Sequence, residues 1–183
     1  MMPSGLFLFR RNVLSQIAPV SIAFLLLFLF FSCRRNGSPE PSAYHDSLMA
    51  CHKRAGKQLE AALASLPENP IGKNSDTFKK AISEERKKVQ DWGAFHEDSS
   101  LVTAVDSCLS SYERLHQTQL PEIRKLLHKP RLSFSKADEA RLEFLYREVE
   151  LLTDRGFKQV LNSSRVFSGK HGLKPPQNIP LQP

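Results

Sequence analysis

Apolar residues between positions 43 and 167 recur every three or four positions, which is the period of an α-helix. No run in this region shows the strict apolar and polar alternation of a half-buried strand. Prolines at positions 67, 70, 121 and 130 divide the pattern, because proline lacks a backbone donor and crowds the preceding helical turn. The sequence therefore predicts an all-α domain.

The pattern predicts about four helices, over residues 43–66, 76–95, 100–128 and 135–167. We expect a kink at Pro121 and not a loop, because the apolar stripe resumes after it with little change of phase. The expected caps and terminators are Ser75, Asp98 or Ser99, a capping box of Ser135 with Asp138, and Gly169.

Four amphipathic helices with short connections fold most simply as an antiparallel up-and-down bundle. The structural alternative is a three-helix bundle with the first helix apart, because the first stripe is rich in alanine and buries less area. Trp92 is expected to anchor the core, and Gly156 is expected to mark a close approach of two helices.

The first 33 residues have the pattern of an export signal. Arg10 and Arg11 precede an apolar run over residues 17–31, which ends in Ser32-Cys33, and no acidic residue occurs before position 40. The segment Phe30-Phe31-Ser32-Cys33 resembles the lipobox of bacterial lipoprotein precursors. That resemblance implies cleavage before Cys33 and lipidation of its sulfur and its new amino group. It also implies the outer membrane over the inner one, because arginine and not aspartate follows the cysteine.

Two other interpretations of this segment stay open: an uncleaved signal anchor that spans the membrane once, and an ordinary secretion signal. Under the lipoprotein interpretation, residues 1–32 are a predicted signal peptide, and residues 33–42 are a lipidated tether. The bundle domain is expected over residues 43–169, and a disordered, proline-rich tail over residues 170–183.

Removal of residues 1–32 would take away only two of the 26 basic side chains, which leaves 24 against 19 acidic ones and a net charge of +5. The remaining 151 residues are enough for one core. A mild positive charge suits an anionic membrane surface or an acidic protein partner, and it lacks the clustered stripe of a nucleic-acid binder.

The sequence lacks four common catalytic and metal-binding motifs: a glycine-rich phosphate loop, Gly-x-Ser-x-Gly, His-Glu-x-x-His and Cys-x-x-Cys. We therefore expect neither catalysis nor a cofactor or metal. His45 and His52 are interpreted as solvated surface histidines. Five further side chains are interpreted as exposed, solubilising charges: Glu84, Glu85, Glu143, Arg147 and Glu148.

Two features remain as candidates for sites. Cys51 and Cys108 fall on inward stripes of an exported domain, which predicts a disulfide between the first and third helices.

The predicted function is a membrane-anchored envelope module that binds a protein partner without catalysis; the alternative is a ligand-carrying or enzymatic bundle. The expected partner surface is the basic face of the second helix, formed by Lys79, Lys80, Arg86, Lys87 and Lys88.

Overall fold

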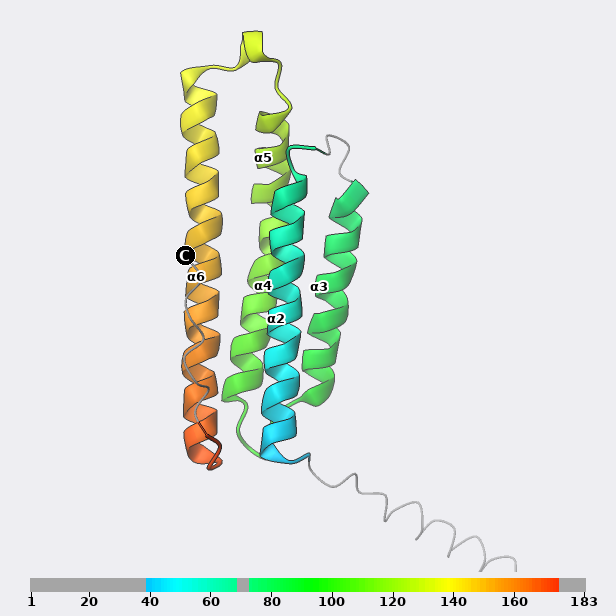
Figure 1. Cartoon of the computed structure of the whole chain (residues 1–183), viewed down its shortest axis with the longest axis vertical. Helices are drawn as coiled ribbons and strands as arrows, with labels where there is room; N and C mark the ends of the chain where they lie inside the picture. Colours follow the sequence, from blue (N-terminus) through cyan, green and yellow to red (C-terminus); the bar gives the residue numbers. More distant parts are fainter. Residues whose placement is uncertain (1–38, 69–72, 175–183) are drawn as a thin grey trace, which may run out of the picture. The chain divides into compact units, whose positions relative to one another are not determined.

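The computed structural model describes residues 39–68 and 73–174, which form a helical bundle (Figure 1). The predicted signal peptide, Cys33 and the end of the predicted tail lie outside the described residues. Within the described part no strand forms, and one isolated bridge pairs Phe95 with Asp98. The elements are α2 (Pro41–Ser65), α3 (Lys73–Trp92), α4 (Ser100–Gln117), α5 (Gln119–Leu127), a 3₁₀ helix η1 (Arg131–Ser133) and α6 (Lys136–Lys170).

The helices alternate in direction, so the predicted antiparallel up-and-down bundle is confirmed (Figure 1). Helix α4 lies centrally and packs against α2, α3, α5 and α6. Helix α2 contributes Tyr44, Leu48 and Leu59 to the core, all of them almost fully buried. The alternative with the first helix lying apart is therefore wrong.

The core consists of aliphatic and aromatic side chains from every long helix, as expected for helices that each bury one stripe. In α4 the buried stripe is wide, because three neighbouring helices cover this helix from different sides. Its buried residues are Leu101, Val102, Ala104, Val105, Cys108, Leu109, Tyr112 and Leu115.

The start of α6 follows the sequence prediction, but two expected helix ends are wrong. Ser135 accepts a hydrogen bond from the backbone N–H of Asp138, whose carboxylate accepts the Ser135 N–H, so the predicted capping box is confirmed. Gly169 lies inside α6, and the positive φ of 66° occurs later, at Gly172. Ser75 lies inside α3, which begins at Lys73, so it is not the cap.

Trp92 is not a core anchor. It is the last residue of α3, where Gly93 has a φ of 61° and turns the chain away from the helix. The indole is 38% exposed and meets the ring of Tyr44 edge-on, with centroids 5.9 Å apart. Tyr44 occupies the buried position and donates its hydroxyl hydrogen to the Gly93 carbonyl at 2.7 Å. Position at the end of α3 therefore outweighs the helical phase that predicted burial.

Of the two residues predicted to cap the start of α4, Asp98 and Ser99, it is Asp98 that makes the side-chain contact. Its carboxylate accepts the backbone N–H of Ser100 at 3.0 Å, whereas Ser99 makes no side-chain capping bond. Asp98 also pairs with Lys170 at 3.0 Å, which joins this turn to the end of α6. These contacts lower the pKa of the Asp98 carboxyl to about 2, with the hydrogen bonds from Ser100 as the main cause.

Helix α4 ends just before α5 begins, and Pro121 explains the break. A proline ring crowds the carbonyl four residues earlier, which here belongs to Gln117, the last residue of α4. Thr118 then closes the turn with hydrogen bonds from its N–H and hydroxyl to the Arg114 carbonyl. Helix α5 continues in the same general direction to Leu127, in agreement with the predicted kink (Figure 1).

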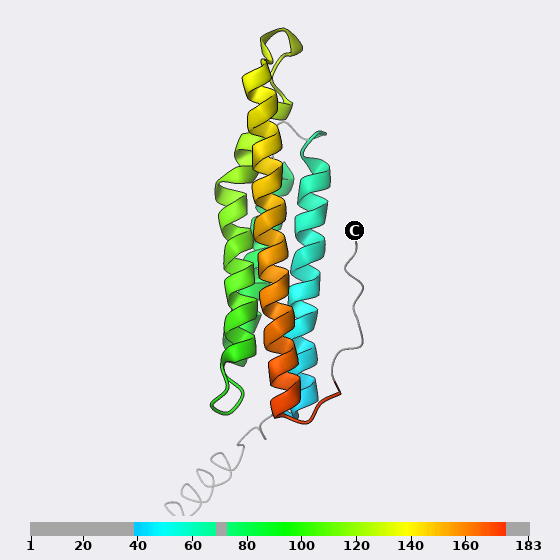
Figure 2. The same ribbon diagram turned by 90° about the vertical axis from the view of Figure 1, so that its left-hand side faces the viewer.

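Helix α6 is the longest element, with 35 residues and a length of about 52 Å. Its second part packs beside α2 and α4, whereas its first part rises with α5 above the ends of α2 and α3 (Figures 1 and 2). The connection between α5 and α6 therefore forms one end of the bundle, opposite the end at which α2 begins. In residues 39–68 and 73–174, no helix combines the length and apolar character needed to cross a membrane.

Candidate binding surfaces

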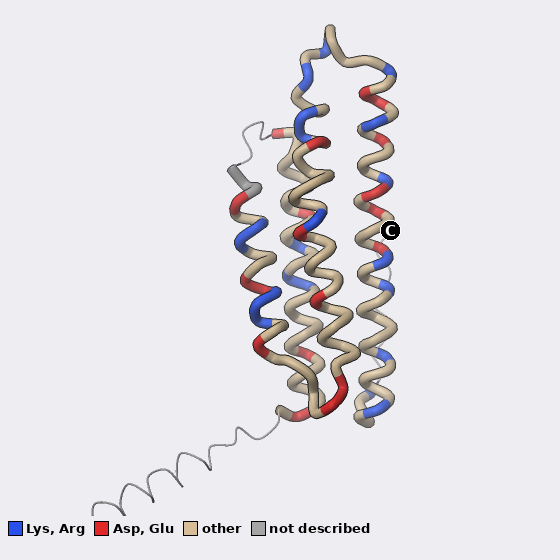
Figure 3. Tube along the Cα trace, turned by 180° about the vertical axis from the view of Figure 1, so that it is seen from behind, with Lys and Arg blue, Asp and Glu red and all other residues tan. Residues whose placement is uncertain are grey.

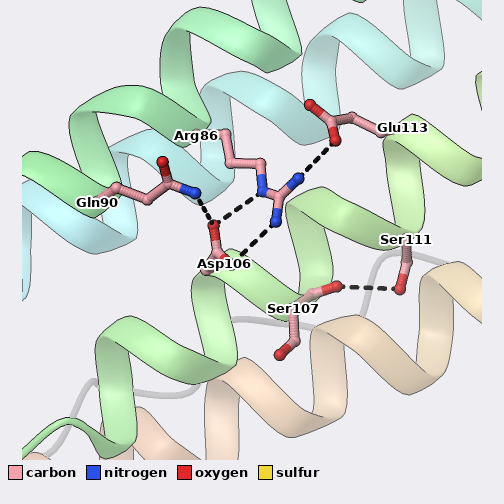
Figure 4. Close-up of polar contacts among 6 residues, drawn as sticks. All are labelled: Arg86, Gln90, Asp106, Ser107, Ser111 and Glu113. Atoms are coloured by element: carbon pink, nitrogen blue, oxygen red, sulfur yellow. Dashed lines mark hydrogen bonds and ion pairs between the residues drawn. The ribbon is translucent and has the colours of Figure 1, made fainter.

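The predicted basic face of α3 is not a free basic surface, because Arg86 points toward α4 (Figure 4). The Arg86 guanidinium binds both carboxylate oxygens of Asp106, at 2.9 and 3.2 Å, and Glu113 at 2.7 Å. Gln90 donates a further hydrogen bond to Asp106 at 3.2 Å. Arg86 is 29% exposed and links two helices, so it is not a free cation of the α3 surface. Partner binding by this face stays a prediction.

A second ion-pair group joins α2 to α3 and removes Glu85 from the solvent. Glu85 is only 7% exposed and receives two hydrogen bonds from Arg54, at 2.7 and 3.0 Å. Lys88 donates a third at 2.8 Å. Burial by itself raises the pKa of the Glu85 carboxyl, but these donors outweigh it and lower the pKa to about 2. The prediction of Glu85 as a solvated charge is wrong, and Lys88 is paired.

Four of the five predicted residues lie exposed on α3: Lys79, Lys80, Lys87 and Lys88, the last of which is paired with Glu85. Acidic side chains are exposed on the same helix, and Lys80 lies 4.0 Å from one of them, Glu84. The exposed surface of α3 therefore carries mixed charge (Figure 3). The exposed acidic residues of α3 are Asp76, Glu84 and Asp91.

Cys51 and Cys108 are both buried free thiols, so the predicted disulfide is not formed in the structure. They face different neighbours. The Cys51 sulfur accepts a hydrogen bond from Arg54 at 3.3 Å, on the side of α2 that meets α3. The Cys108 sulfur faces α6, 2.9 Å from where a Cβ atom on Gly156 would stand. The expected close approach at Gly156 is confirmed, and it involves α4 and α6.

The two histidines of α2 are not solvated, in contrast to the sequence prediction. His52 is 7% exposed and lies against the ring of Phe157 of α6, with centroids 5.9 Å apart. Burial lowers the pKa of its imidazole. His45 bonds through Nε2 to the Ser164 hydroxyl at 2.8 Å. Both rings therefore help to hold α6 beside α2. The described residues contain no group of three or more metal-binding side chains.

The end of the bundle formed by residues 124–136, here called the distal tip, has a different character. It contains five lysines and arginines and no acidic residue. Lys129 is neutralised by Asp138 at 2.6 Å, just beyond the tip. Three other cations are exposed, and no described residue forms an ion pair with them: Lys125, Arg131 and Lys136. Lysines and arginines are visible along this connection in Figure 3.

Apolar side chains accompany these charges at the distal tip. Leu132 in η1 is fully exposed. Beside it lies an open pocket of about 280 Å³, in which apolar side chains predominate. The pocket is lined by Leu126, Leu127, Lys129, Arg131, Phe134 and Leu142.

Hydrogen bonds hold the distal tip to the rest of the bundle. His128 bonds to the Leu66 carbonyl, just beyond the end of α2, at 3.0 Å. Arg141 of α6 binds both carboxylate oxygens of Glu122 of α5 at 2.8 Å. With the capping box at Ser135, these contacts fix both sides of the connection.

The sequence analysis missed the distal tip because Pro121 was interpreted only as a kink and Pro130 only as the end of a helix. Two signals were present: the absence of acidic residues from 123 to 137, and Leu132 outside any helical stripe. No protein family, curated protein or solved structure matches the chain.

Proposed function

We propose that the protein is a lipid-anchored, non-catalytic module of the bacterial cell envelope that binds through its distal tip. The observation that carries this proposal is the exposure of Leu132 beside three cations that form no ion pair with a described residue. These side chains form no such contact within the described bundle, whereas Arg86 joins α3 to α4 and Lys88 pairs with Glu85 within α3.

The anchor in this proposal is Cys33, as its resemblance to a lipobox cysteine implies. Seven residues separate Cys33 from the start of α2 at Pro41. A chain of that length spans at most about 25 Å. Helix α6 is about 52 Å long, and the distal tip lies where this helix begins, at the end of the bundle opposite the start of α2. We propose that the bundle acts as a spacer between an anchored end and a binding end. We favour the outer membrane over the inner membrane as the one that holds the anchor.

The pocket at the tip favours binding over catalysis. It is open and mainly apolar, and its two ionisable side chains are Lys129 and Arg131. An enzyme or carrier in the alternative hypothesis needs converging polar groups in an enclosed site, and this pocket supplies neither. The buried ionisable residues Glu85 and His52 lie at contacts between helices, where Glu85 binds Arg54 and His52 packs against Phe157.

The anchor can be tested by labelling cells with a fatty acid. We expect the wild-type protein to carry label in the membrane fraction and Cys33→Ser to lose both label and membrane location. Cys51→Ser is the matched control, because Cys51 is a buried thiol within the bundle. Equal labelling of wild type and Cys33→Ser, or no labelling of either, would refute the lipid anchor and favour the signal-anchor interpretation.

A further inference from the structure

We propose that the distal tip docks on a membrane surface rich in anionic lipids, with Leu132 entering the interface and the neighbouring cations facing lipid phosphates. This inference rests on the proposed function, because it names the partner of the same tip. It replaces the expected protein partner with a lipid surface.

The shape of the tip favours a lipid surface. Leu132 belongs to η1 and is fully exposed. A projecting apolar side chain flanked by cations can enter the boundary between headgroups and acyl chains. Leu126, Leu127 and Phe134, which line the adjoining pocket, extend the apolar character of this end.

The charges fit the same partner. Lys125 lies in α5, Arg131 in η1 and Lys136 at the start of α6, so the cations come from three successive elements. Such a spread suits many phosphates on a surface better than one phosphate in a converging site. Each cation near an anionic membrane strengthens binding by about fivefold at moderate salt. The exposed lysines of α3 lack this advantage because acidic side chains lie among them.

The tip is also held in place before any contact with lipid. The His128 ring bonds to the Leu66 carbonyl, just beyond the end of α2, and the pair of Arg141 with Glu122 joins α6 to α5 next to the tip. A surface that is already ordered loses less conformational entropy on binding. The tip can therefore bind as a preformed surface.

The test uses the full chain with a single tryptophan as reporter. Trp92 is the only tryptophan, so Trp92→Phe with Leu132→Trp moves the fluorophore to the tip. The matched control is Trp92→Phe with Leu151→Trp, since Leu151 is also exposed, at 57%, but lies midway along α6. Each protein is mixed with excess vesicles of brominated phosphatidylcholine, with or without phosphatidylglycerol, and quenching of tryptophan fluorescence is measured.

We expect bromine to quench the tip tryptophan when phosphatidylglycerol is present and not on phosphatidylcholine alone, while the Leu151 reporter is not quenched on either. Adding Lys125→Gln, Arg131→Gln and Lys136→Gln should return quenching to the phosphatidylcholine level. The equivalent change of three exposed lysines on α3, at positions 79, 80 and 87, should leave quenching intact.

Three results would overturn the proposal: no quenching of the tip tryptophan with phosphatidylglycerol, equal quenching on both vesicle types, or loss of quenching in the α3 variant alone. The first would return the tip to an acidic protein partner. Flotation of the full chain with phosphatidylcholine vesicles reports the membrane anchor separately. The anchor and the tip can therefore fail independently.

Discussion

The contact between Gly156 and Cys108 predicts that one methyl group added to α6 destabilises the bundle. A Cβ atom at position 156 would lie 2.9 Å from the Cys108 sulfur and 3.6 Å from its Cβ atom. The Cys108 Cα atom stands only 3.8 Å away, so the α4 backbone lies directly behind the side chain. The added methyl group must push the sulfur aside or separate α4 from α6.

The expected size of the effect comes from two opposing terms. Overpacking a filled core costs about 1–3 kcal/mol. Replacing a glycine inside a helix by alanine returns about 0.5–1 kcal/mol through helix propensity. We therefore expect Gly156→Ala to lower the free energy of unfolding by about 1–2 kcal/mol, or the melting temperature by about 3–8 °C.

Urea denaturation followed by circular dichroism at the helical band measures this change. Gly56→Ala is the matched control, because Gly56 is helical, in α2, and has no atom within 4 Å of its would-be Cβ. That variant should be more stable by about 0.5–1 kcal/mol. In a Cys108→Ala background the sulfur is gone, and Gly156→Ala should become neutral or stabilising. If Gly156→Ala stabilised the wild-type protein as much as Gly56→Ala does, or were unaffected by Cys108→Ala, the reasoning would be refuted.

Three further predictions concern polar groups in the core and at helix contacts. Arg86→Gln removes the ion pairs with α4 and should lower the free energy of unfolding by about 1–2 kcal/mol in urea denaturation. Lys87→Gln, at an exposed position, should change it by less than about 0.5 kcal/mol. Similar values for both variants would contradict a structural role for Arg86. Because burial lowers the pKa of His52, the unfolded chain takes up a proton before the folded one does, so stability should fall as pH drops below about 6.5. His52→Leu should flatten that decline in melts between pH 7 and 5, and an unchanged slope would argue against this origin. Burial raises the pKa of the Cys51 thiol to about 11 and also raises that of Cys108. Iodoacetamide at pH 8 should therefore label both thiols only after unfolding, as read by mass spectrometry. Rapid labelling of either thiol in the native protein would show an accessible thiolate and contradict this prediction.

Local features of the fold were predictable because they depend on residues close together in the sequence. The 3.6-residue period predicted the helices, Pro121 predicted the break between α4 and α5, and Ser135 with Asp138 predicted the start of α6. Errors at helix ends were small, such as the placement of the terminator at Gly169, because the last turn responds to neighbouring contacts. Gly156 was also placed correctly as a close approach, although its partner Cys108 was not foreseen.

The sequence by itself determined the helices, their inward stripes and the capping box, because short-range hydrogen bonds and backbone sterics act within a few residues. Only the tertiary structure decided the roles of side chains at the edges of those stripes. Arg86 and Glu85 are close in the sequence to exposed lysines, yet α4 and α2 supply carboxylates and a guanidinium that draw them inward. His52 is buried because α6 places Phe157 beside it. The distal tip likewise exists only where α5, η1 and α6 meet, since a helical period shows which face is apolar but not which neighbour covers its edges.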